Sequence, residues 1–325
     1  MALTPQEKAA YEAAAIAPVL VVTGPTATGK TRLAVELSRR FQGEIISVDS
    51  RQVYRGMDLG TGKDLEEYRE GGTPVPTHLL DVVDPGEPYD LCRYLRDARR
   101  ALGEIHSRGR LPVLSGGTPL YLAGLLDGYE MGSAPPDPEF RRSLEGLSSA
   151  ELRALLEKEA TPELLARTDM TQDRRIIRAL EIARGTPAEP VLPLKKTLIL
   201  APKYSRTEVR ERILQRLDAR LDAGLIEEVQ TLRNQGLPPE KLEWFGLEYR
   251  YVGRYLEGQL SRQEMHDQLL TQIRRFAKRQ DIWFRKLERE GHPIHWIPQG
   301  DLEEATSLVE EFLEKGGRRK EEGGS

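Results

Sequence analysis

Residues 24–31 of this chain, GPTATGKT, place two glycines, a lysine and a threonine at a spacing that suits phosphate binding. They fit the pattern G-x-x-x-x-G-K-[ST] and stand between an apolar run and an amphipathic stretch. In such a turn, backbone N–H groups face phosphate oxygens, the lysine adds a positive charge, and the hydroxyl that follows can bind Mg²⁺. The residues that we predict to bind phosphate are Gly24, Pro25, Thr26, Ala27, Thr28, Gly29, Lys30 and Thr31, and Thr31 is the predicted metal ligand.

A carboxylate follows the next apolar run, in the stretch EIISVDSRQVYRGMDLGTGKD. Asp49 comes directly after residues 44–48, which are predicted to form a strand. Carboxyl ends of parallel strands border the ligand crevice, so Asp49 is expected to face whatever the glycine-rich loop holds. It could bind magnesium through water or take a proton from a nucleophile, and it could equally cap the turn that follows. Its position alone does not decide between these roles.

The elements that must position these residues are indicated by apolar bursts that alternate with amphipathic stretches, as in a parallel sheet with crossover helices. We predict strands at 19–23, 44–48, 111–115 and 197–200, and helices at 30–41, 91–108, 119–126 and through most of the chain after 205. The predicted fold is α/β, a parallel sheet of the P-loop NTPase type flanked by helices, with a small helical insertion and a helical C-terminal part.

Four segments are expected along the chain. Residues 16–131 form the first part of the catalytic core, and 132–193 form a helical insertion whose edges are the proline-bearing GSAPPDPEF and GTPAEPVLP. Residues 194–315 complete the core with C-terminal helices. The segment GGRRKEEGGS at 316–325 is expected to be a disordered tail.

Charge and composition narrow the class of partner. The 325 residues carry 48 Lys and Arg against 52 Asp and Glu, a net charge of -4, so any nucleic-acid surface must be a local patch. Cys92 is the only cysteine, which excludes an intrachain disulfide and a cysteine-based zinc finger. No run of 18 apolar residues occurs, and we expect a protein of the cytoplasm without a membrane contact.

Two basic clusters could form such a patch. One lies in DRRIIRALEI, and the other occupies a predicted helix that contains RRFAKRQDIWFRK. On the second helix the apolar residues expected to pack inward are Met265, Leu269, Ile273, Phe276, Trp283 and Leu287. The charges that would then face outward are Arg274, Arg275, Lys278, Arg279, Arg285 and Lys286. A solvated helix face is the usual meaning of such charges, and phosphate contact becomes the better interpretation if the core modifies a nucleobase.

These stretches, together with GGTPLY and ERILQRLDARLDAGLIEEV, occur in the order found in the tRNA dimethylallyltransferase family, which the chain resembles over roughly residues 19–297. The resemblance implies that the loop grips the diphosphate of dimethylallyl diphosphate as a leaving group. The dimethylallyl group would pass to the exocyclic N6 amine of the adenosine 3′ to the anticodon, position 37. Mg²⁺ would assist, Asp49 would be the catalytic base, and Thr26 and Arg216 would bind the diphosphate near the bond that breaks.

The same resemblance assigns an RNA surface. Thr118 in GGTPLY matches a residue beside the substrate nucleotide, and the insertion matches a helical tRNA-gripping domain. The expected partners are the anticodon stem-loop of tRNA and dimethylallyl diphosphate, and the enzyme is expected to act as a monomer. The residues expected to contact tRNA are Asp49, Ser50, Arg51, Gln52, Thr118, Arg141, Arg174, Arg175, Ile176, Ile177, Arg178, Arg274, Arg275 and Lys278.

The chain departs from the family pattern at two places in the core, and its insertion is short and lacks the usual Asp-Pro-x-Ala element around EATPELLARTD. Asp64 stands after GTGK where the family commonly has proline, and WFGLEYRY replaces a Gly-Tyr-Lys-type turn, which leaves the roles of residues 246–250 open. Two other functions also stay open. One is an isopentenyltransferase acting on free adenine nucleotides, and the other is a P-loop kinase or NTPase, or a nucleotide-gated RNA-binding protein without chemistry.

Overall fold

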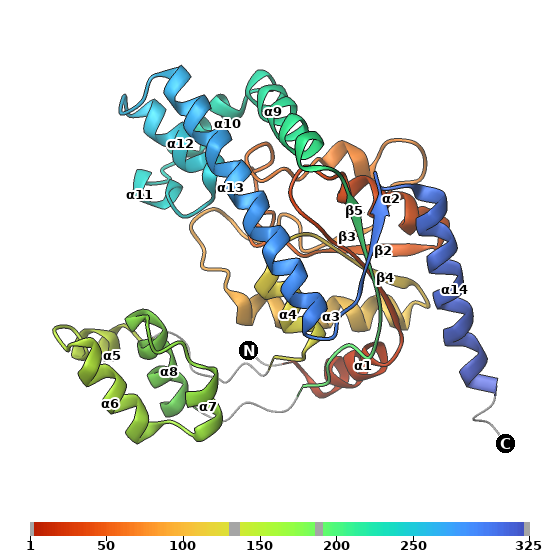
Figure 1. The fold of residues 1–325 in the computed structure, drawn as a ribbon, viewed down its shortest axis with the longest axis horizontal. Helices are drawn as coiled ribbons and strands as arrows, with labels where there is room; N and C mark the ends of the chain where they lie inside the picture. Colours follow the sequence, from red (N-terminus) through yellow and green to blue (C-terminus); the bar gives the residue numbers. More distant parts are fainter. Residues whose placement is uncertain (1–2, 130–136, 186–190, 322–325) are drawn as a thin grey trace. The chain divides into compact units, whose positions relative to one another are not determined.

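The computed structural model describes residues 3–129, 137–185 and 191–321. The chain divides into two compact units, one made of residues 1–127 and 192–325 and the other of residues 128–191. The larger unit carries the sheet, and the smaller unit is helical (Figure 1). Each unit is described by itself below.

The described part of the larger unit contains a six-stranded sheet with the strand order β3-β2-β4-β1-β5-β6. Every pairing is parallel. The strands are β1 (Pro18–Val22), β2 (Gly43–Ser47), β3 (Thr77–His78), β4 (Leu111–Ser115), β5 (Lys196–Lys203) and β6 (Ile294–Pro298). The predicted parallel α/β sheet is therefore confirmed, including its four predicted strands. The two edge strands were not predicted, because β3 has only two residues and β6 lies in a region expected to be helical.

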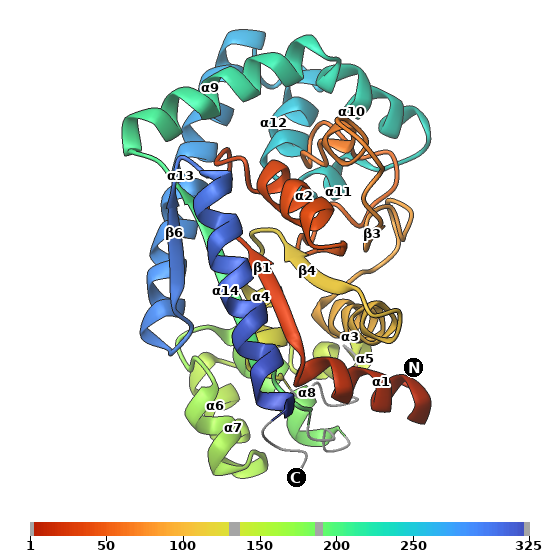
Figure 2. The same ribbon diagram turned by 90° about the vertical axis from the view of Figure 1, so that its right-hand side faces the viewer.

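Helices cover both faces of this sheet (Figures 1 and 2). The helices α2 and α14 pack on one face, and α1 and α3 pack on the other. The larger unit contains α1 (Pro5–Ala15), α2 (Lys30–Arg40), α3 (Leu91–Ser107), α4 (Pro119–Leu126), α9 (Arg206–Asp222), α10 (Leu225–Asn234), α11 (Pro239–Leu242), α12 (Leu247–Leu256), α13 (Arg262–Arg289) and α14 (Leu302–Glu321). The two flanking layers make the sheet a buried central element, which is why its strands are apolar on both faces.

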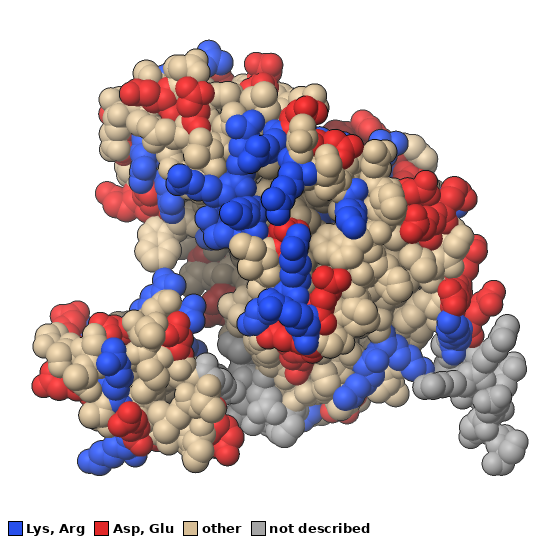
Figure 3. Space-filling view, viewed as in Figure 1, with Lys and Arg blue, Asp and Glu red and all other residues tan. Residues whose placement is uncertain are grey.

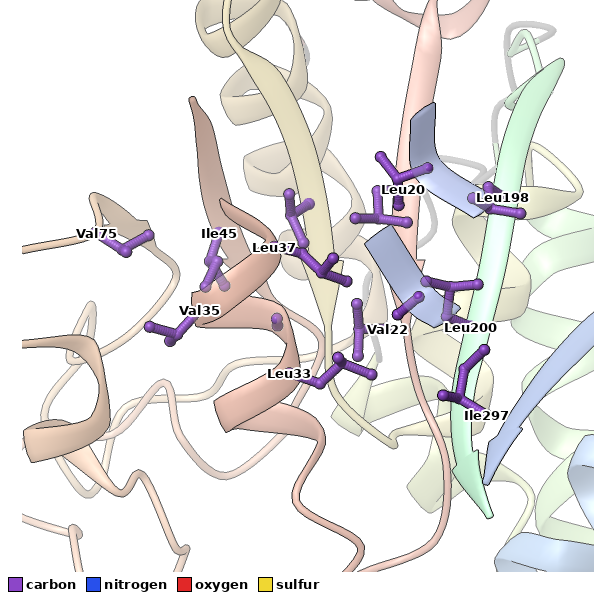
Figure 4. Packing of buried hydrophobic residues seen from close by; sticks show 14 of the residues in the cluster. Leu20, Val22, Leu33, Val35, Leu37, Ile45, Val75, Leu198, Leu200 and Ile297 are labelled. Atoms are coloured by element: carbon purple, nitrogen blue, oxygen red, sulfur yellow. The ribbon is translucent and has the colours of Figure 1, made fainter. Parts of the chain in front are cut away.

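The main core lies between the sheet and α2 and α14 (Figure 4). Leu20 and Val22 of β1 point to this face because alternate residues of a strand share a face. They meet Leu33 and Leu37 of α2, which are four residues apart and so lie on one side of the helix. This packing fixes the start of α2, and with it the end of the predicted phosphate-binding loop at residues 24–31, against the carboxyl end of β1.

Several helices begin at a capping box, in which a Ser or Thr and the Glu three residues later bond each other's backbone N–H. Thr4 with Glu7 starts α1, Ser205 with Glu208 starts α9, and Ser261 with Glu264 starts α13. The helix α1 was not among the predicted elements. Its signal was present in the sequence as TPQE, a threonine, a proline at the first helical turn and a glutamate.

The inward face of α13 differs from the expected one. Phe276 was predicted to pack inward, but its side chain is 38% exposed, and Trp283 is only half-buried. An α-helix has about 3.6 residues per turn, so the inward-facing row drifts from a strict seven-residue repeat. It passes through Ala277 and Phe284, which follow these two residues in the sequence. The buried residues of α13 are Met265, Leu269, Ile273, Ala277, Gln280, Phe284 and Leu287.

The smaller unit has its own helices and core. It contains α5 (Pro138–Ser143), α6 (Ser149–Glu159), α7 (Pro162–Arg167) and α8 (Asp173–Arg184). Its buried residues are Leu144, Leu152, Leu156, Leu164, Ile176, Ala179 and Leu180. The predicted opening of the insertion at residue 132 lies outside the described residues, and the unit itself spans 128–191.

At the C-terminus, α14 continues to Glu321 and so covers the first part of the segment 316–325 that was expected to be disordered. Lys, Arg and Glu are good helix formers and extend the amphipathic helix past the two glycines. The last residues of the predicted tail, 322–325, lie outside the described residues. Among the helices that the structure describes, none is long and apolar enough to cross a membrane.

Candidate active site

A cavity of about 330 Å³ lies at the carboxyl ends of β1, β2 and β4. Each of these strands is followed by a loop that lines it, and α9, α12 and α13 supply the remaining walls. The cavity brings together residues that are far apart in the sequence, among them Thr26, Asp49, Thr118 and Arg216. This is the edge at which a parallel sheet binds its ligands.

The phosphate-binding loop is shaped by backbone conformations that favour glycine. Gly24 has φ 135°, and Gly29, the N-cap of α2, has φ 77°. Within the loop, the Thr28 hydroxyl donates to the Pro25 carbonyl at 2.9 Å, and the Lys30 ammonium donates to the same carbonyl at 3.3 Å. The loop is thus closed on itself, with the N-terminus of α2 and the Lys30 ammonium beside the cavity.

The helix α9 holds this loop from outside with two arginines one turn apart. Arg212 donates from Nε to the Ala27 carbonyl at 2.7 Å, and Arg216 donates to the Thr26 hydroxyl. Residues four apart on a helix share a face, so both side chains reach the loop. Burial and the charge of Arg220 lower the pKa of Arg216 to about 10, so it is a cation at neutral pH. Burial and the neighbouring Arg216 lower the pKa of Lys30 to about 8.

Asp49 faces the same cavity from the end of β2. Its Oδ1 accepts the backbone N–H of Arg51 at 2.8 Å and that of Gln52 at 3.4 Å, so one oxygen closes the turn that was the alternative interpretation of this residue. Oδ2 is then the oxygen that can accept a proton. Burial raises the pKa of Asp49, against the hydrogen bonds from Arg51 and Gln52 and the charge of Lys30. The two roles proposed for Asp49 are therefore compatible.

The loop after β4 supports Asp49 from its neighbour Ser50. Thr118 accepts the Ser50 backbone N–H on its hydroxyl at 3.1 Å, and its own N–H donates to the Val48 carbonyl. Gly116 allows this contact, because a Cβ built on it would lie 2.3 Å from the Val48 carbonyl oxygen. Thr118 is the N-cap residue of α4, but its side chain does not cap that helix. Its hydroxyl holds the Asp49 turn instead.

The two departures from the family pattern meet in this cavity. Arg220 lies 3.5 Å from Asp64 and 4.0 Å from Glu248, measured between guanidinium nitrogens and carboxylate oxygens. Arg220 is one turn from Arg216 on α9, so the two carboxylates balance a second cation beside the first. Burial raises the pKa of Glu248, and the charge of Arg220 opposes that shift. The role of the turn at residues 246–250 was open from the sequence, and in the structure Gly246, Leu247 and Glu248 line the cavity.

The wall formed by residues 58–63 is held by two groups that were not singled out from the sequence. The Glu228 carboxylate accepts the backbone N–H groups of Asp58, Leu59 and Gly60 at 2.7–3.1 Å, and it also accepts the Tyr249 hydroxyl. Lys63 is completely buried and pairs with Asp58 and Asp81. The GLIEEV motif contained the signal for Glu228, since a carboxylate one turn after an apolar residue can point inward.

A third residue missed from the sequence connects the loops to α13. Gln280 is 5% exposed, and its Oε1 accepts the Thr26 N–H at 2.9 Å while its Nε2 donates to the Gly117 carbonyl at 3.0 Å. Its signal was its spacing, because position 280 is seven residues after the buried Ile273 and so shares its face. It was missed because Phe276, and not Gln280, was assigned to the inward face of α13.

Exposed cations cover the outer face of α13 (Figure 3). Arg274, Arg275 and Lys278 are exposed, and none of the ion pairs among the described residues involves them. In contrast, Arg285 pairs with Asp281 and Lys286 pairs with Glu290. Figure 3 shows that Lys and Arg side chains also gather over the neighbouring α9. The face is a local basic patch on a chain of net charge -4.

In the smaller unit, the residues expected to contact tRNA differ in exposure and in their partners. Arg141 and Arg178 both pair with the buried Glu181, and Arg175 pairs with Asp169. Ile176 is fully buried in the core of this unit, and Ile177 packs partly against it, so these side chains stabilise the unit. Arg174 is exposed on α8.

Two family models match the chain. The model described as IPP transferase matches residues 52–287, and the one described as isopentenyl transferase matches residues 17–74. This chain belongs to the IPP transferase family. The IPP transferase match begins at Gln52 and spans the GGTPLY loop, the smaller unit, α9, α12 and most of α13. The isopentenyl transferase match covers the predicted phosphate-binding loop and Asp49.

Known IPP transferases resemble the chain over most of its length. The tRNA dimethylallyltransferase 1 of Geotalea uraniireducens is 47% identical over 296 residues, which are 90% of this chain and 96% of that protein. The full-length tRNA isopentenylpyrophosphate transferase of Bacillus halodurans is 32% identical with a TM-score of 0.68, covering 94% of this chain and 99% of that structure. A eukaryotic dimethylallyltransferase acting on tRNA is 25% identical with a TM-score of 0.78, covering 92% and 80%.

Proposed function

We propose that this IPP transferase transfers a dimethylallyl group from dimethylallyl diphosphate to the N6 amine of the adenosine beside the anticodon of tRNA, position 37, and releases diphosphate. The observation that carries the proposal is one cavity that is lined by the predicted phosphate-binding loop and by a half-buried carboxylate, Asp49. The names of the relatives favour tRNA as the acceptor over a free nucleotide. A phosphate-binding loop alone would not distinguish this reaction from phosphoryl transfer.

The donor side of the cavity suits a leaving group. The allylic carbon–oxygen bond breaks while negative charge grows on the diphosphate, and Lys30, Arg216 and the Thr26 hydroxyl are placed to stabilise that charge. Arginine is well suited because its planar fork can hold two phosphate oxygens. No ATP is consumed in this reaction, since the substrate itself carries the leaving group.

The acceptor side suits a weak nucleophile. The lone pair of an adenine amine is delocalised into the ring, so loss of its proton helps the new carbon–nitrogen bond to form. Asp49 takes that proton on Oδ2, and its raised pKa makes it a stronger base as long as it stays ionised. A positioned base of this kind contributes about 10²- to 10⁴-fold.

Mg²⁺ is the metal that these residues fit. The described residues contain no group of three or more His, Cys, Asp or Glu that could hold a metal ion. Mg²⁺ does not need one, since it keeps several waters and takes phosphate oxygens as ligands. The Thr31 hydroxyl would bind it directly and Asp49 through water, and both residues line the cavity. When bound, it would supply positive charge beside the leaving diphosphate.

The RNA would bind across the basic face of α13, with the smaller unit as a second contact. An amine in a stacked loop is reached only if the base is extruded into the cavity. Arg51 and Gln52 line the cavity and would contact the extruded nucleobase, and Gln52 also forms hydrogen bonds with the Ser47 hydroxyl and the Gly62 carbonyl. We also propose that the enzyme acts as a monomer in the cytoplasm, where its RNA substrate is found.

The test is to incubate the purified protein with undermodified tRNA, Mg²⁺ and radiolabelled dimethylallyl diphosphate. Label should enter the RNA. The matched control is Asp49→Asn, which should lower the rate at least about 100-fold but still bind a non-reacting thio analogue of the donor, because the substitution changes the base and leaves the phosphate-binding loop intact. Transfer to AMP, ADP or ATP in place of tRNA would refute the proposed acceptor, and a loss below about tenfold would refute the base.

A further inference from the structure

Gln280 forms hydrogen bonds with two loops of the cavity at once: the loop at residues 24–31, which would bind the prenyl donor, and the loop at residues 116–118, beside the proposed acceptor site. Among the described side chains, no other is shown to bond both loops. Its two hydrogen bonds span 254 and 163 residues of sequence, to the Thr26 N–H and to the Gly117 carbonyl. Both groups belong to loops that line the cavity, and Gln280 lines it too. The amide therefore bridges the two halves of the proposed reaction.

Each hydrogen bond leads to a residue with a proposed chemical role. On the donor side, Thr26 carries the hydroxyl that Arg216 bonds, so fixing the Thr26 backbone fixes that pair. On the acceptor side, Gly117 is followed by Thr118, whose hydroxyl holds Ser50 next to Asp49. The distance between the leaving group and the base therefore depends in part on this side chain, in addition to the pairing of β1 with β4 and the hydrogen bond from the Thr23 hydroxyl to the Gly116 carbonyl.

The site of Gln280 is also tight. A Cβ built on Gly117 would lie 2.8 Å from Nε2 of Gln280 and 3.2 Å from the Gly24 carbonyl oxygen. The amide is buried at 5% exposure, and an amide that lost either partner there would leave a buried polar group unsatisfied. Loss of either hydrogen bond would therefore cost free energy in the folded protein.

We infer that Gln280 is a positioning residue, which sets the alignment of the allylic carbon and the adenosine amine by tying the Thr26 loop to the Thr118 loop. This inference rests on the proposed prenyl transfer and assigns a residue to it that the fold alone does not. Alignment of two reactants acts on the chemical step, and a misplacement of about 1 Å can cost about 100-fold in rate. Removal of the bridge should therefore affect kcat more than the binding of either substrate.

The test compares Gln280→Leu, Gln280→Glu and the control Gln263→Leu, an exposed glutamine of the same helix. Both Gln280 variants should lower kcat about 10- to 100-fold at pH 8. Their dissociation constants for a thio analogue of the donor and for tRNA should stay within about threefold of the wild type, since Lys30, Arg216 and the basic face of α13 remain. The control should behave as the wild type.

The pH dependence of Gln280→Glu separates the hydrogen bonds from packing. A neutral carboxyl has one donor and one acceptor, as the amide uses here, whereas an ionised carboxylate only accepts. The charged groups that line the cavity beside Gln280 are Lys30, Asp49, Arg51, Asp64, Arg216, Arg220 and Glu248, and the Gly116–Thr118 loop adds none. Burial raises the pKa of Asp49 and of Glu248 in this cavity against the nearby cations, and we expect it to raise the pKa of the introduced carboxyl as well. The variant should therefore be ionised and impaired at pH 8 and become neutral as the pH falls.

The ratio of its kcat to that of the wild type should then rise as the pH falls from 8 to 6. A ratio that does not change with pH, a kcat of Gln280→Leu within about threefold of the wild type, or a loss confined to substrate binding would each overturn the inference. If the wild type transferred no label to tRNA, the proposed function would fail instead, and the binding measurements would still report on the loops.

Discussion

The charge state of Lys30 should make donor binding depend on pH. Burial and the neighbouring Arg216 lower the pKa of Lys30 to about 8 in the free protein. A bound diphosphate places several negative charges beside this ammonium and raises its pKa again, so the donor binds the protonated form. If only that form binds, the dissociation constant is about twice its low-pH value at pH 8 and about tenfold higher at pH 9. Binding at pH 8 should take up about half a proton per molecule.

The assay is isothermal titration calorimetry with a non-reacting thio analogue of the donor at pH 7, 8 and 9, in two buffers of different ionisation enthalpy. The difference between buffers gives the proton uptake. Arg216 adds no slope in this range, because its lowered pKa of about 10 still lies above it. A dissociation constant that stays constant between pH 7 and 9, without proton uptake, would refute the reasoning.

The matched control is Lys30→Met, which should bind the analogue weakly and without this pH dependence.

The lowered pKa of Lys30 also makes the free energy of unfolding depend on pH. Between about pH 8 and 10.5, the unfolded chain binds more protons at Lys30 than the folded one, so the free energy of unfolding should rise with pH in that window. Below pH 8 the cost of the buried charge is fully present. Lys30→Met should therefore stabilise the ligand-free protein at pH 7, as measured by thermal unfolding.

Three further outcomes are expected. Glu228→Gln should lower the free energy of unfolding by about 2 kcal/mol in urea titrations, because an amide cannot accept all the donors that the carboxylate holds, whereas the exposed Glu227→Gln should not. Gly116→Ala should abolish transfer, since its Cβ would lie 2.3 Å from the Val48 carbonyl oxygen, while Gly72→Ala, at a similar φ but with nothing within 4 Å, should cost far less. Replacement of Arg274, Arg275 and Lys278 by Ala should reduce the slope of log binding constant against log salt concentration for tRNA by up to about one unit per lost phosphate contact. The maximal rate at saturating RNA should stay nearly unchanged. Equal slopes for wild type and variant would show that this face of α13 is only solvated.

The parts of the fold that could be predicted are the elements whose pattern of apolar, glycine and proline residues is contained within the element and its flanks. The strand at 111–115 and the helix at 119–126 match β4 and α4 to the residue, because each is a short apolar element punctuated by glycine or proline. The edge strand β6 could not be predicted in this way. Its two buried residues, Ile294 and Ile297, are three positions apart and so lack the alternation of a strand, and its pairing with β5 is not visible in the sequence of either segment.

The residues of the candidate site also differ in whether their partners are near or distant in sequence. The placement of the loop at residues 24–31 and of Asp49 at one cavity could be predicted, because the loop residues are adjacent in sequence and Asp49 follows a strand, and their roles in binding and catalysis stay predictions. Gln280 could not, since its role comes from two loops that are more than 150 residues away and meet α13 only in the folded protein. Glu228 was missed for the same reason, because the backbone N–H groups that it accepts belong to a distant loop.

The acidic departures Asp64 and Glu248 are best understood together. Lys30, Arg216 and Arg220 would place three cations around one cavity of about 330 Å³, and like charges that close disfavour one another when buried. Asp64 and Glu248 both lie beside Arg220, at 3.5 and 4.0 Å, so they offset the cation that is farther from the Thr26 hydroxyl. Arg216, which donates a hydrogen bond to Thr26, keeps its charge for the diphosphate. The two departures therefore act as one feature, since either carboxylate without Arg220 would be an unpaired negative charge facing a negatively charged substrate.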